Sequence, residues 1–183
     1  MDANGAWNYT ASSAHPEFVA GTNYSDVFTV TSADGTTSTI TVNILGTNDA
    51  AVISTATVNL TETNSVLAAS GILTISDADS ATTFVASTIA GSYGSIALQA
   101  NGQWQYTASS AHNEFVGGTN YSDVFTVTST DGTTSTITVN ILGTNDAAVI
   151  STATANLTET NSVLAASGIL TISDVDSAAT FVA

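Results

Sequence analysis

The chain has 183 residues, of which 15 are acidic and none is lysine, arginine or cysteine, so its formal charge at pH 7 is −15. Because no side chain can neutralise phosphate groups, nucleic acids and anionic membrane surfaces are excluded as partners. Disulfide bonds and thiolate metal sites are excluded too, and no apolar run is long enough for membrane insertion. Carboxylates that lie close together can therefore be neutralised only by bound cations, by protonation or by salt.

A repeat of 97 residues organises the chain, and Trp7, for example, recurs as Trp104. At this offset 76 of the 86 overlapping pairs are identical. The identity includes surface positions, where core packing does not demand it, so tandem duplication is the simplest cause. In chain order we expect the C-terminal half of a repeat at 1–48, a complete β-sandwich repeat at 49–145 and the N-terminal half of a repeat at 146–183.

Short strands with alternating apolar residues are predicted throughout the complete repeat. Trp104 and Tyr106 alternate with polar residues, and so do Ile137 and Val139, which follow an Asp-Gly turn signal. We expect seven strands and no long helix, with the strands at 51–60, 67–76, 83–89, 94–98, 103–107, 123–130 and 134–142. So many short strands in fewer than a hundred residues indicate an all-β fold, an immunoglobulin-like or cadherin-like β-sandwich.

Several motifs of the complete repeat resemble, in the same order, those of the VCBS repeat. They lie at residues 77–79 (Asp-x-Asp), 91–98, 101–107, 123–127 and 143–146 (Gly-Thr-Asn-Asp). The resemblance implies a domain that occurs in tandem in very large secreted bacterial proteins, often RTX adhesins. It also implies an extender at the bacterial cell surface, with calcium (Ca2+) at the links between neighbouring repeats.

Calcium takes six to eight oxygen ligands, mainly from carboxylates and carbonyls. In a meandering sandwich, Glu62 and Asp123 fall at the same end as the linker that follows the complete repeat. The ligands predicted at that junction are Glu62, Asp123, Asn145, Asp146, Asp174 and Asp176. Those predicted at the preceding junction are Asp26, Asn48, Asp49, Asp77 and Asp79, and Glu159 is the counterpart of Glu62 in the next copy.

Some of these aspartates could instead be ordinary turn residues, because aspartate favours turns through hydrogen bonds to the backbone. We prefer that interpretation for Asp131, which precedes glycine. For the junction residues we prefer calcium, because no basic side chain can offset converging carboxylates. His15 and His112 have no second histidine or cysteine for a zinc site, and we interpret His112 and Glu114 as a solvated surface pair.

The leading functional hypothesis is a structural extender rather than an enzyme, because a catalytic site would not need near-identical copies. The alternatives are a glycan-binding or protein-binding β-sandwich module and a spacer in a secreted enzyme. Trp104 and Tyr106 could stack on a sugar, but their alternation favours the core. Each half repeat exposes a strand edge and an apolar face. We expect the halves either to be poorly ordered or to complement each other between molecules, head to tail.

Overall fold

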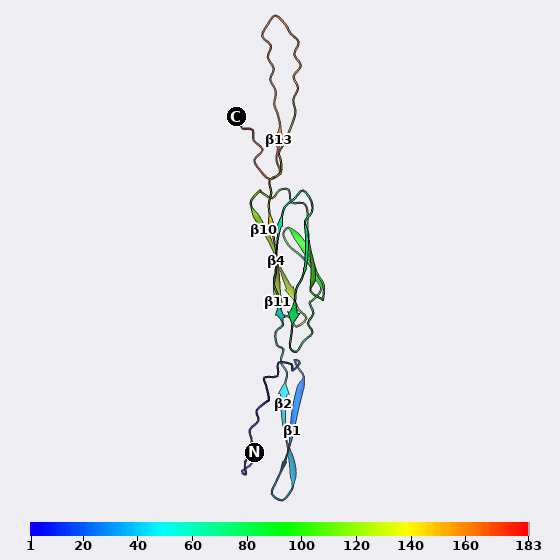
Figure 1. The fold of residues 1–183 in the computed structure, drawn as a ribbon, viewed down its shortest axis with the longest axis vertical. Coiled ribbons are helices and arrows are strands. Elements are labelled where there is room, and N and C mark those ends of the chain that lie inside the picture. Colours follow the sequence, from blue (N-terminus) through cyan, green and yellow to red (C-terminus); the bar gives the residue numbers. More distant parts are fainter. Residues whose placement is uncertain (183) are drawn as a thin grey trace.

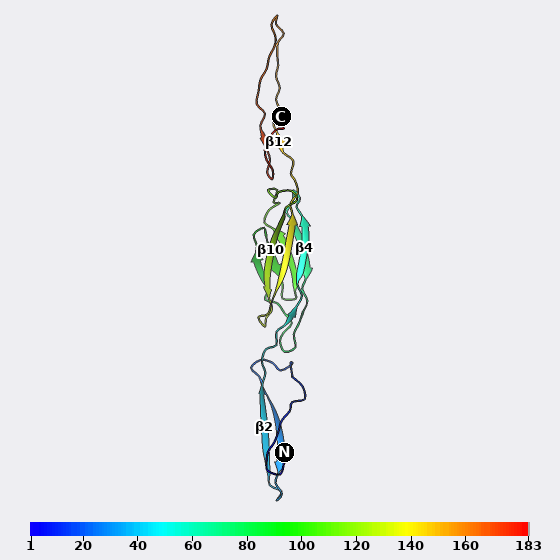
Figure 2. The same ribbon diagram turned by 90° about the vertical axis from the view of Figure 1, so that its left-hand side faces the viewer.

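The computed structural model describes residues 1–182 and shows an elongated molecule, with a β-sandwich at its centre and an open segment at each end (Figures 1 and 2). None of the described residues lies in a helix, and the prediction of an all-β fold is confirmed. None of them forms a helix that could cross a membrane.

Two sheets pack face to face in the central sandwich. The first has the order β10-β11-β4 and the second the order β5-β9-β8-β7, while β3 and β6 form a small separate pair. Strand β4 runs parallel to β11, and the other pairings are antiparallel. The strands are β3 (Val52–Ile53), β4 (Ala56–Thr61), β5 (Ala68–Ile72), β6 (Ile75–Ser76), β7 (Ser87–Ala90), β8 (Gly94–Leu98), β9 (Gln103–Ala108), β10 (Asn120–Thr128) and β11 (Thr134–Leu142).

The core lies between the two sheets and contains the residues that the alternating pattern turns inward. Tyr106, Ile137 and Val139 are fully buried, and Trp104 is buried with them. The prediction that Trp104 and Tyr106 belong to the core is therefore confirmed. Leu73 and Phe84 also belong to this core, although both come from segments between strands.

Two of the expected strands are interrupted, and a third is mostly wrong. The expected strand at 51–60 is divided because its first part pairs with β6 and its second with β11. The strand at 67–76 is divided in the same way, between β9 and β3. Of the expected strand at 83–89, only 87–89 falls within β7, because Phe84 instead bridges to Ser129 next to the other sheet. Each break marks a place where the chain changes from one pairing partner to another.

The two end segments contain few strands. The first carries the hairpin of β1 (Asn23–Thr31) and β2 (Thr37–Leu45), and within residues 146–182 the last carries only β12 (Val149–Ile150) and β13 (Ile172–Ser173). Residues that are buried in the centre are exposed here. Trp104 is 6 % exposed but its counterpart Trp7 is 53 % exposed, because the end segments lack an opposing sheet.

Candidate functional site

The linker after the central sandwich lies against Glu62. The backbone amide of Glu62 donates to the carbonyl of Leu142 over 2.8 Å, which places Glu62 beside the end of β11. The hydroxyl of Thr144 donates to Glu62 Oε2 and, over 3.2 Å, to the Glu62 carbonyl. Glu62 is 1 % exposed, and its Oε1 atom has no hydrogen-bond partner. Asn145 Nδ2 donates to the carbonyl of Asp146, which shapes the linker itself.

The linker before the central sandwich lies against the Asp-x-Asp turn. The amide of Asp49 donates to Asp79 Oδ1 over 3.2 Å, and Ser80 Oγ donates to Asn48 Oδ1 over 3.3 Å. Asp77 Oδ1 accepts the amides of Asp79 and Ser80, so this carboxylate also closes its own turn. The structure thus brings four of the predicted ligands of this junction together through hydrogen bonds.

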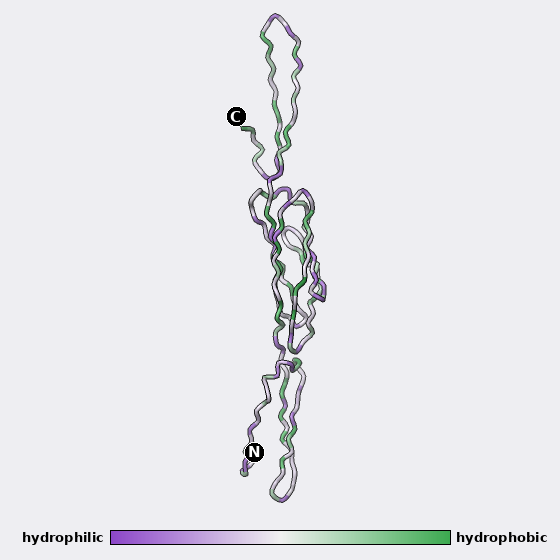
Figure 3. Tube along the Cα trace, viewed as in Figure 1, coloured by the Kyte–Doolittle hydropathy of each residue, from purple (hydrophilic) through white to green (hydrophobic). Residues whose placement is uncertain are grey.

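The next copy of that turn lies beyond the central sandwich. Asp174 Oδ1 accepts the amides of Asp176 and Ser177, as its counterpart does. The side-chain hydrogen bond with Ser177 is the main reason why the pKa of Asp174 is below its ordinary value. Because β12 pairs with β13, the turn is held near the start of the segment, where Asp146 lies. Hydrophilic segments mark both junctions (Figure 3).

Buried carboxylate oxygens without a partner are concentrated at these two junctions. They are Glu62 Oε1, Asp77 Oδ2, Asp79 Oδ2, Asp146 Oδ2, Asp176 Oδ1 and Asp176 Oδ2. An unpaired buried carboxylate is costly unless a cation or a proton neutralises it. Calcium fits this donor set, because it is a hard cation that binds carboxylate oxygens. In residues 1–182, however, no three histidine, aspartate or glutamate side chains already form a group that could hold a metal ion.

Three further predicted ligands have other surroundings. Asp123 is buried, and its two carboxylate oxygens accept the amides of Ser92 and Tyr93 over 2.7 and 3.1 Å. These bonds give Asp123 a structural role at the turn between β7 and β8. Asp26, its counterpart, accepts a hydrogen bond of 2.6 Å from the hydroxyl of Tyr9. Glu159 is exposed, unlike Glu62, and the hydrogen bonds of the described residues do not join it to a linker.

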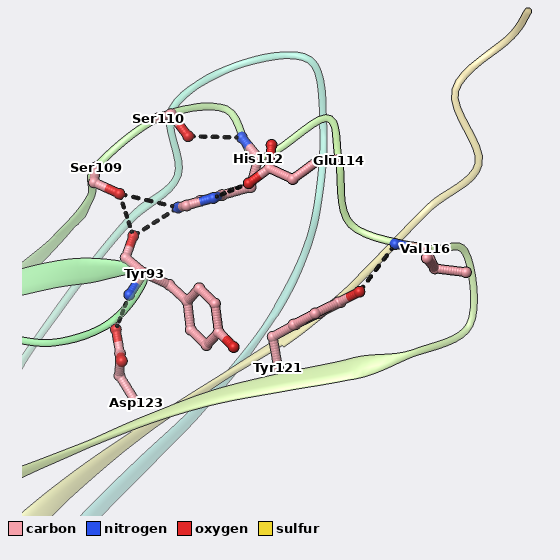
Figure 4. Close-up of polar contacts among 8 residues, drawn as sticks. All are labelled: Tyr93, Ser109, Ser110, His112, Glu114, Val116, Tyr121 and Asp123. Atoms are coloured by element: carbon pink, nitrogen blue, oxygen red, sulfur yellow. Dashed lines mark hydrogen bonds and ion pairs between the residues drawn. The ribbon is translucent and has the colours of Figure 1, made fainter. Parts of the chain in front are cut away.

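The loop at residues 109–119, which we call the histidine loop, packs the buried rings of His112 and Phe115 against Tyr93 and Tyr121, which are partly buried. Figure 4 shows the polar contacts of His112 in this loop. His112 is 6 % exposed, so the interpretation of a solvated surface pair is wrong for the histidine. Its ring stacks on Phe115, with 4.5 Å between centroids, and Phe115 stacks on Tyr121 at 3.7 Å. Tyr93 presents its edge or face at a right angle to these rings. The sequence did not reveal this cluster, because Tyr93 lies 19 positions before His112.

The surroundings of His112 favour its protonated form. Its Nδ1 atom lies 2.8 Å from Glu114 Oε1, and its Nε2 atom lies 2.7 Å from the carbonyl oxygen of Tyr93. Both oxygens only accept, so both ring nitrogens must donate, and only the imidazolium can do so. Burial lowers the pKa of His112, but the hydrogen bonds to Glu114 and Tyr93 and the charges of Glu114 and Asp123 raise it by more.

The histidine loop also holds the start of the following linker. The amide of Gly118 donates to the carbonyl of Gly143 over 2.9 Å, and the amide of Gly143 donates to the carbonyl of Thr119 over 2.8 Å. A Cβ atom at Gly143 would lie 2.4 Å from the carbonyl oxygen of Val116. The linker therefore begins from a glycine packed tightly against this loop.

Asp131 has a wider role than the expected turn residue. Its Oδ1 atom accepts the amide of Thr133 over 3.0 Å, as a turn aspartate does, and also the hydroxyl of Ser129. Its Oδ2 atom accepts the amide of Ala51 over 2.9 Å. This hydrogen bond joins the tip of the β10–β11 hairpin to the chain segment that enters the sandwich. The hydrogen bonds from Ser129, Thr133 and Ala51 hold the pKa of Asp131 far below its ordinary value.

The chain thus carries one β-sandwich, flanked by acidic linkers and by two segments that repeat parts of its sequence at an interval of 97 residues. Residues 48–143, just over half of the chain, match the family described as the bacterial cadherin-like domain, and the chain belongs to that family. No curated protein matches the chain. Domains of this family are typically extracellular or at the cell surface.

Proposed function

We propose that the chain is a segment of the structural extender of a large secreted bacterial adhesin, built of VCBS-type repeats as in RTX adhesins. Its role would be mechanical rather than catalytic, because it would hold a distant binding domain away from the cell surface. The near-identity of the repeats supports this role, since added copies add length without adding a new surface.

Calcium would make the array rigid by binding at each junction between neighbouring repeats. The observation that carries this proposal is the set of buried, unpartnered carboxylate oxygens at both junctions of a chain without lysine or arginine. Cadherin-like domains generally bind calcium, which agrees with it. The junction carboxylates are not preassembled into one cluster. Binding would therefore draw the linker and the turns together, so that the ion couples the orientation of one repeat to the next.

The residues available to the ion at the following junction are Glu62, Asn145, Asp146, Asp174 and Asp176. At the preceding junction they are Asn48, Asp49, Asp77 and Asp79. Asp123 and Asp26 already accept the hydrogen bonds described above, so we assign them only a secondary role in binding the ion. When bound, calcium would supply positive charge that no side chain of the repeat other than histidine can provide.

Rigidity can be tested by measuring distances between spin labels across a junction. Thr29 and Thr126 occupy equivalent exposed positions one repeat apart, and the chain has no cysteine to interfere. A chain with Thr29→Cys and Thr126→Cys, labelled at both, should give a narrow distance distribution in calcium and a broad one in chelator. Labels at Thr57→Cys and Ala97→Cys, both within the sandwich, are the control and should not respond. Equal widths with and without calcium across the junction would overturn the proposal.

A further inference from the structure

His112 holds its backbone in a conformation that residues with a side chain rarely adopt. Its φ angle is +60°, in the left-handed region. The His112 amide donates to Ser110 Oγ over 3.2 Å, and the His112 carbonyl accepts the amide of Phe115 over 2.9 Å. These bonds close a tight turn at residues 110–115. Because left-handed backbone costs free energy for a residue other than glycine, the turn persists only while the contacts of the ring hold it.

The contacts of the ring depend on the proton of the imidazole. The Tyr93 carbonyl oxygen lies 2.7 Å from Nε2 and Glu114 Oε1 lies 2.8 Å from Nδ1, so the imidazolium donates to both (Figure 4). A neutral ring has one donor, and its other nitrogen would turn a lone pair toward an acceptor. The Tyr93 carbonyl is fixed, because it also accepts the amide of Ser109 over 2.8 Å. The Glu114 side chain is 59 % exposed and can turn to water, so loss of the proton releases Glu114.

A stack of rings joins His112 to the rest of the loop. The His112 ring stacks on Phe115, and the Phe115 ring stacks on Tyr121 of β10. The Tyr121 hydroxyl accepts the amide of Val116 over 3.1 Å, which fixes the loop one residue beyond Phe115 (Figure 4). Residues 112–116 thus form one unit with the start of β10, and the place of the His112 ring sets the place of that unit.

The same unit forms the surface on which the following linker lies. A Cβ atom at Gly143 would lie 2.9 Å from the carbonyl oxygen of Phe115 and 2.4 Å from that of Val116. A Cβ atom at Gly117 would lie 3.0 Å from the amide nitrogen of Asn145. Together with the two hydrogen bonds between Gly143 and the loop, these close approaches place residues 143–145 directly against the loop. A shift of the loop therefore changes the surface that holds the linker.

We propose that the histidine loop is a pH-sensitive restraint on the linker that follows the sandwich. While His112 is protonated, the loop holds residues 143–145 against the sandwich. Once His112 is neutral, the loop loses its bond to Glu114 and the linker detaches more often. The part of the chain that is free to bend then begins before Gly143 instead of after Asn145. The restraint does not involve calcium, so it does not rest on the proposed function.

The charges around His112 determine the direction of the pH effect. Glu114 faces the ring from the loop itself, and Asp123 acts on it from β10 through its charge. The phenol groups of Tyr93 and Tyr121 also pack against the stacked rings. The chain has no lysine or arginine to oppose protonation.

Burial lowers the pKa of His112, but the hydrogen bonds to Glu114 and Tyr93 and the two carboxylate charges raise it by more. The protonated ring is therefore favoured by the folded loop. The linker should be held fully below about pH 6.5, the ordinary pKa of histidine, and less firmly as the pH rises through the higher folded pKa.

Amide hydrogen exchange of the full chain, followed by NMR in chelator between pH 5.5 and pH 8.5, tests the proposal. Its readouts are the amides of Gly118 and Gly143, which bond the loop to the linker. Their protection, corrected for the intrinsic pH dependence of exchange, should fall about fivefold, the factor that loss of one hydrogen bond gives. The midpoint should equal that of the His112 ring signals in the same sample. Gly132, in the exposed turn between β10 and β11, is the internal control and should keep its protection.

Three variants identify the titrating group. Glu114→Gln keeps an oxygen for Nδ1 but removes the charge, so the midpoints of the ring and of both amides should move to lower pH together. The Glu114 side chain is exposed, so this substitution should not affect folding. In His112→Gln the protection should no longer depend on pH. Glu62→Gln is the matched control, because Glu62 is another titratable group bound to the linker, through Thr144, and it should leave the midpoint unchanged.

A constant protection of Gly118 and Gly143 across the titration of the His112 ring would overturn the proposal. So would amide midpoints that stay in place when Glu114→Gln moves that of the ring, or that move in Glu62→Gln. An equal loss of protection at Gly132 would also overturn it, because the sandwich as a whole would then become less stable and the loop would not restrain the linker specifically.

Discussion

Glu62 illustrates how single residues connect the fold to the proposed function. Its side chain is almost fully buried, and one carboxylate oxygen accepts from Thr144 while the other has no partner. The sequence predicted its place beside the linker from strand order alone. Burial could not be predicted, because it depends on packing against the end of β11.

We expect Glu62→Gln to have opposite effects with and without calcium. In chelator the neutral amide should be less costly to bury than an unpaired carboxylate, so the melting temperature should rise by a few degrees. In calcium the stabilisation by the ion should be largely lost. Glu159→Gln is the matched control, because Glu159 is exposed, and it should change neither value. Thermal melts of the three chains check this, and a full calcium response in Glu62→Gln would contradict it.

His112 is a second residue whose environment decides its chemistry. Its folded pKa is raised above 6.5, so the stability it contributes is fully present below about pH 6.5 and is lost as the pH rises through the folded pKa. Loss of one donor should cost about 1 kcal/mol, the net value of one hydrogen bond.

Denaturant unfolding between pH 6 and pH 9 measures this effect. The carboxylates remain ionised in that range, so the free energy of unfolding should fall with rising pH in the parent chain. It should be nearly flat in His112→Gln. His15→Gln is the control, since His15 lies in the open end segment, and it should retain the slope. If the free energy of unfolding of His112→Gln still fell with rising pH, the slope would have to come from another group.

At the scale of elements, alternation in the sequence predicted the strands that run without interruption. The expected strands at 94–98 and 134–142 coincide with β8 and β11. The strands that change partner were not predicted correctly, because alternation reports which side is buried and not which strand lies alongside. For the same reason, no local pattern in the sequence could predict the hydrogen bond between Asp131 and Ala51, which are 80 positions apart.

The contact between the histidine loop and the linker leads to a prediction at this scale. Gly143→Ala would place a methyl group against the backbone carbonyls of Phe115 and Val116, which cannot move without shifting the loop. We expect a loss of about 1–3 kcal/mol, and a fall of about 10 °C in melting temperature. Gly168→Ala, where a Cβ atom meets nothing within 4 Å, should have no effect. Equal melting temperatures for the two variants would show that the linker is not held there.

At the scale of the whole molecule, the chain is a sandwich with an acidic junction at each end. The formal charge is −15 and the chain has no lysine or arginine. Without calcium, the carboxylates that meet at each junction would therefore repel one another. Calcium would remove that repulsion where it is greatest. The period of 97 residues was readable from the sequence, because the two copies are nearly identical. How each linker lies against its neighbouring turns could be seen only in the structure.

The most direct test of the calcium junctions is a thermal melt of the full chain in calcium, in magnesium and in chelator. If free calcium exceeds the dissociation constant a hundredfold, each site should add about 2.7 kcal/mol. The melting temperature should then rise by about 10 °C or more in calcium. Magnesium should give a much smaller rise, because it prefers a tighter octahedral site and keeps its water. Equal melting temperatures in calcium and chelator would contradict the account and leave the acidic residues as turn residues of a plain spacer.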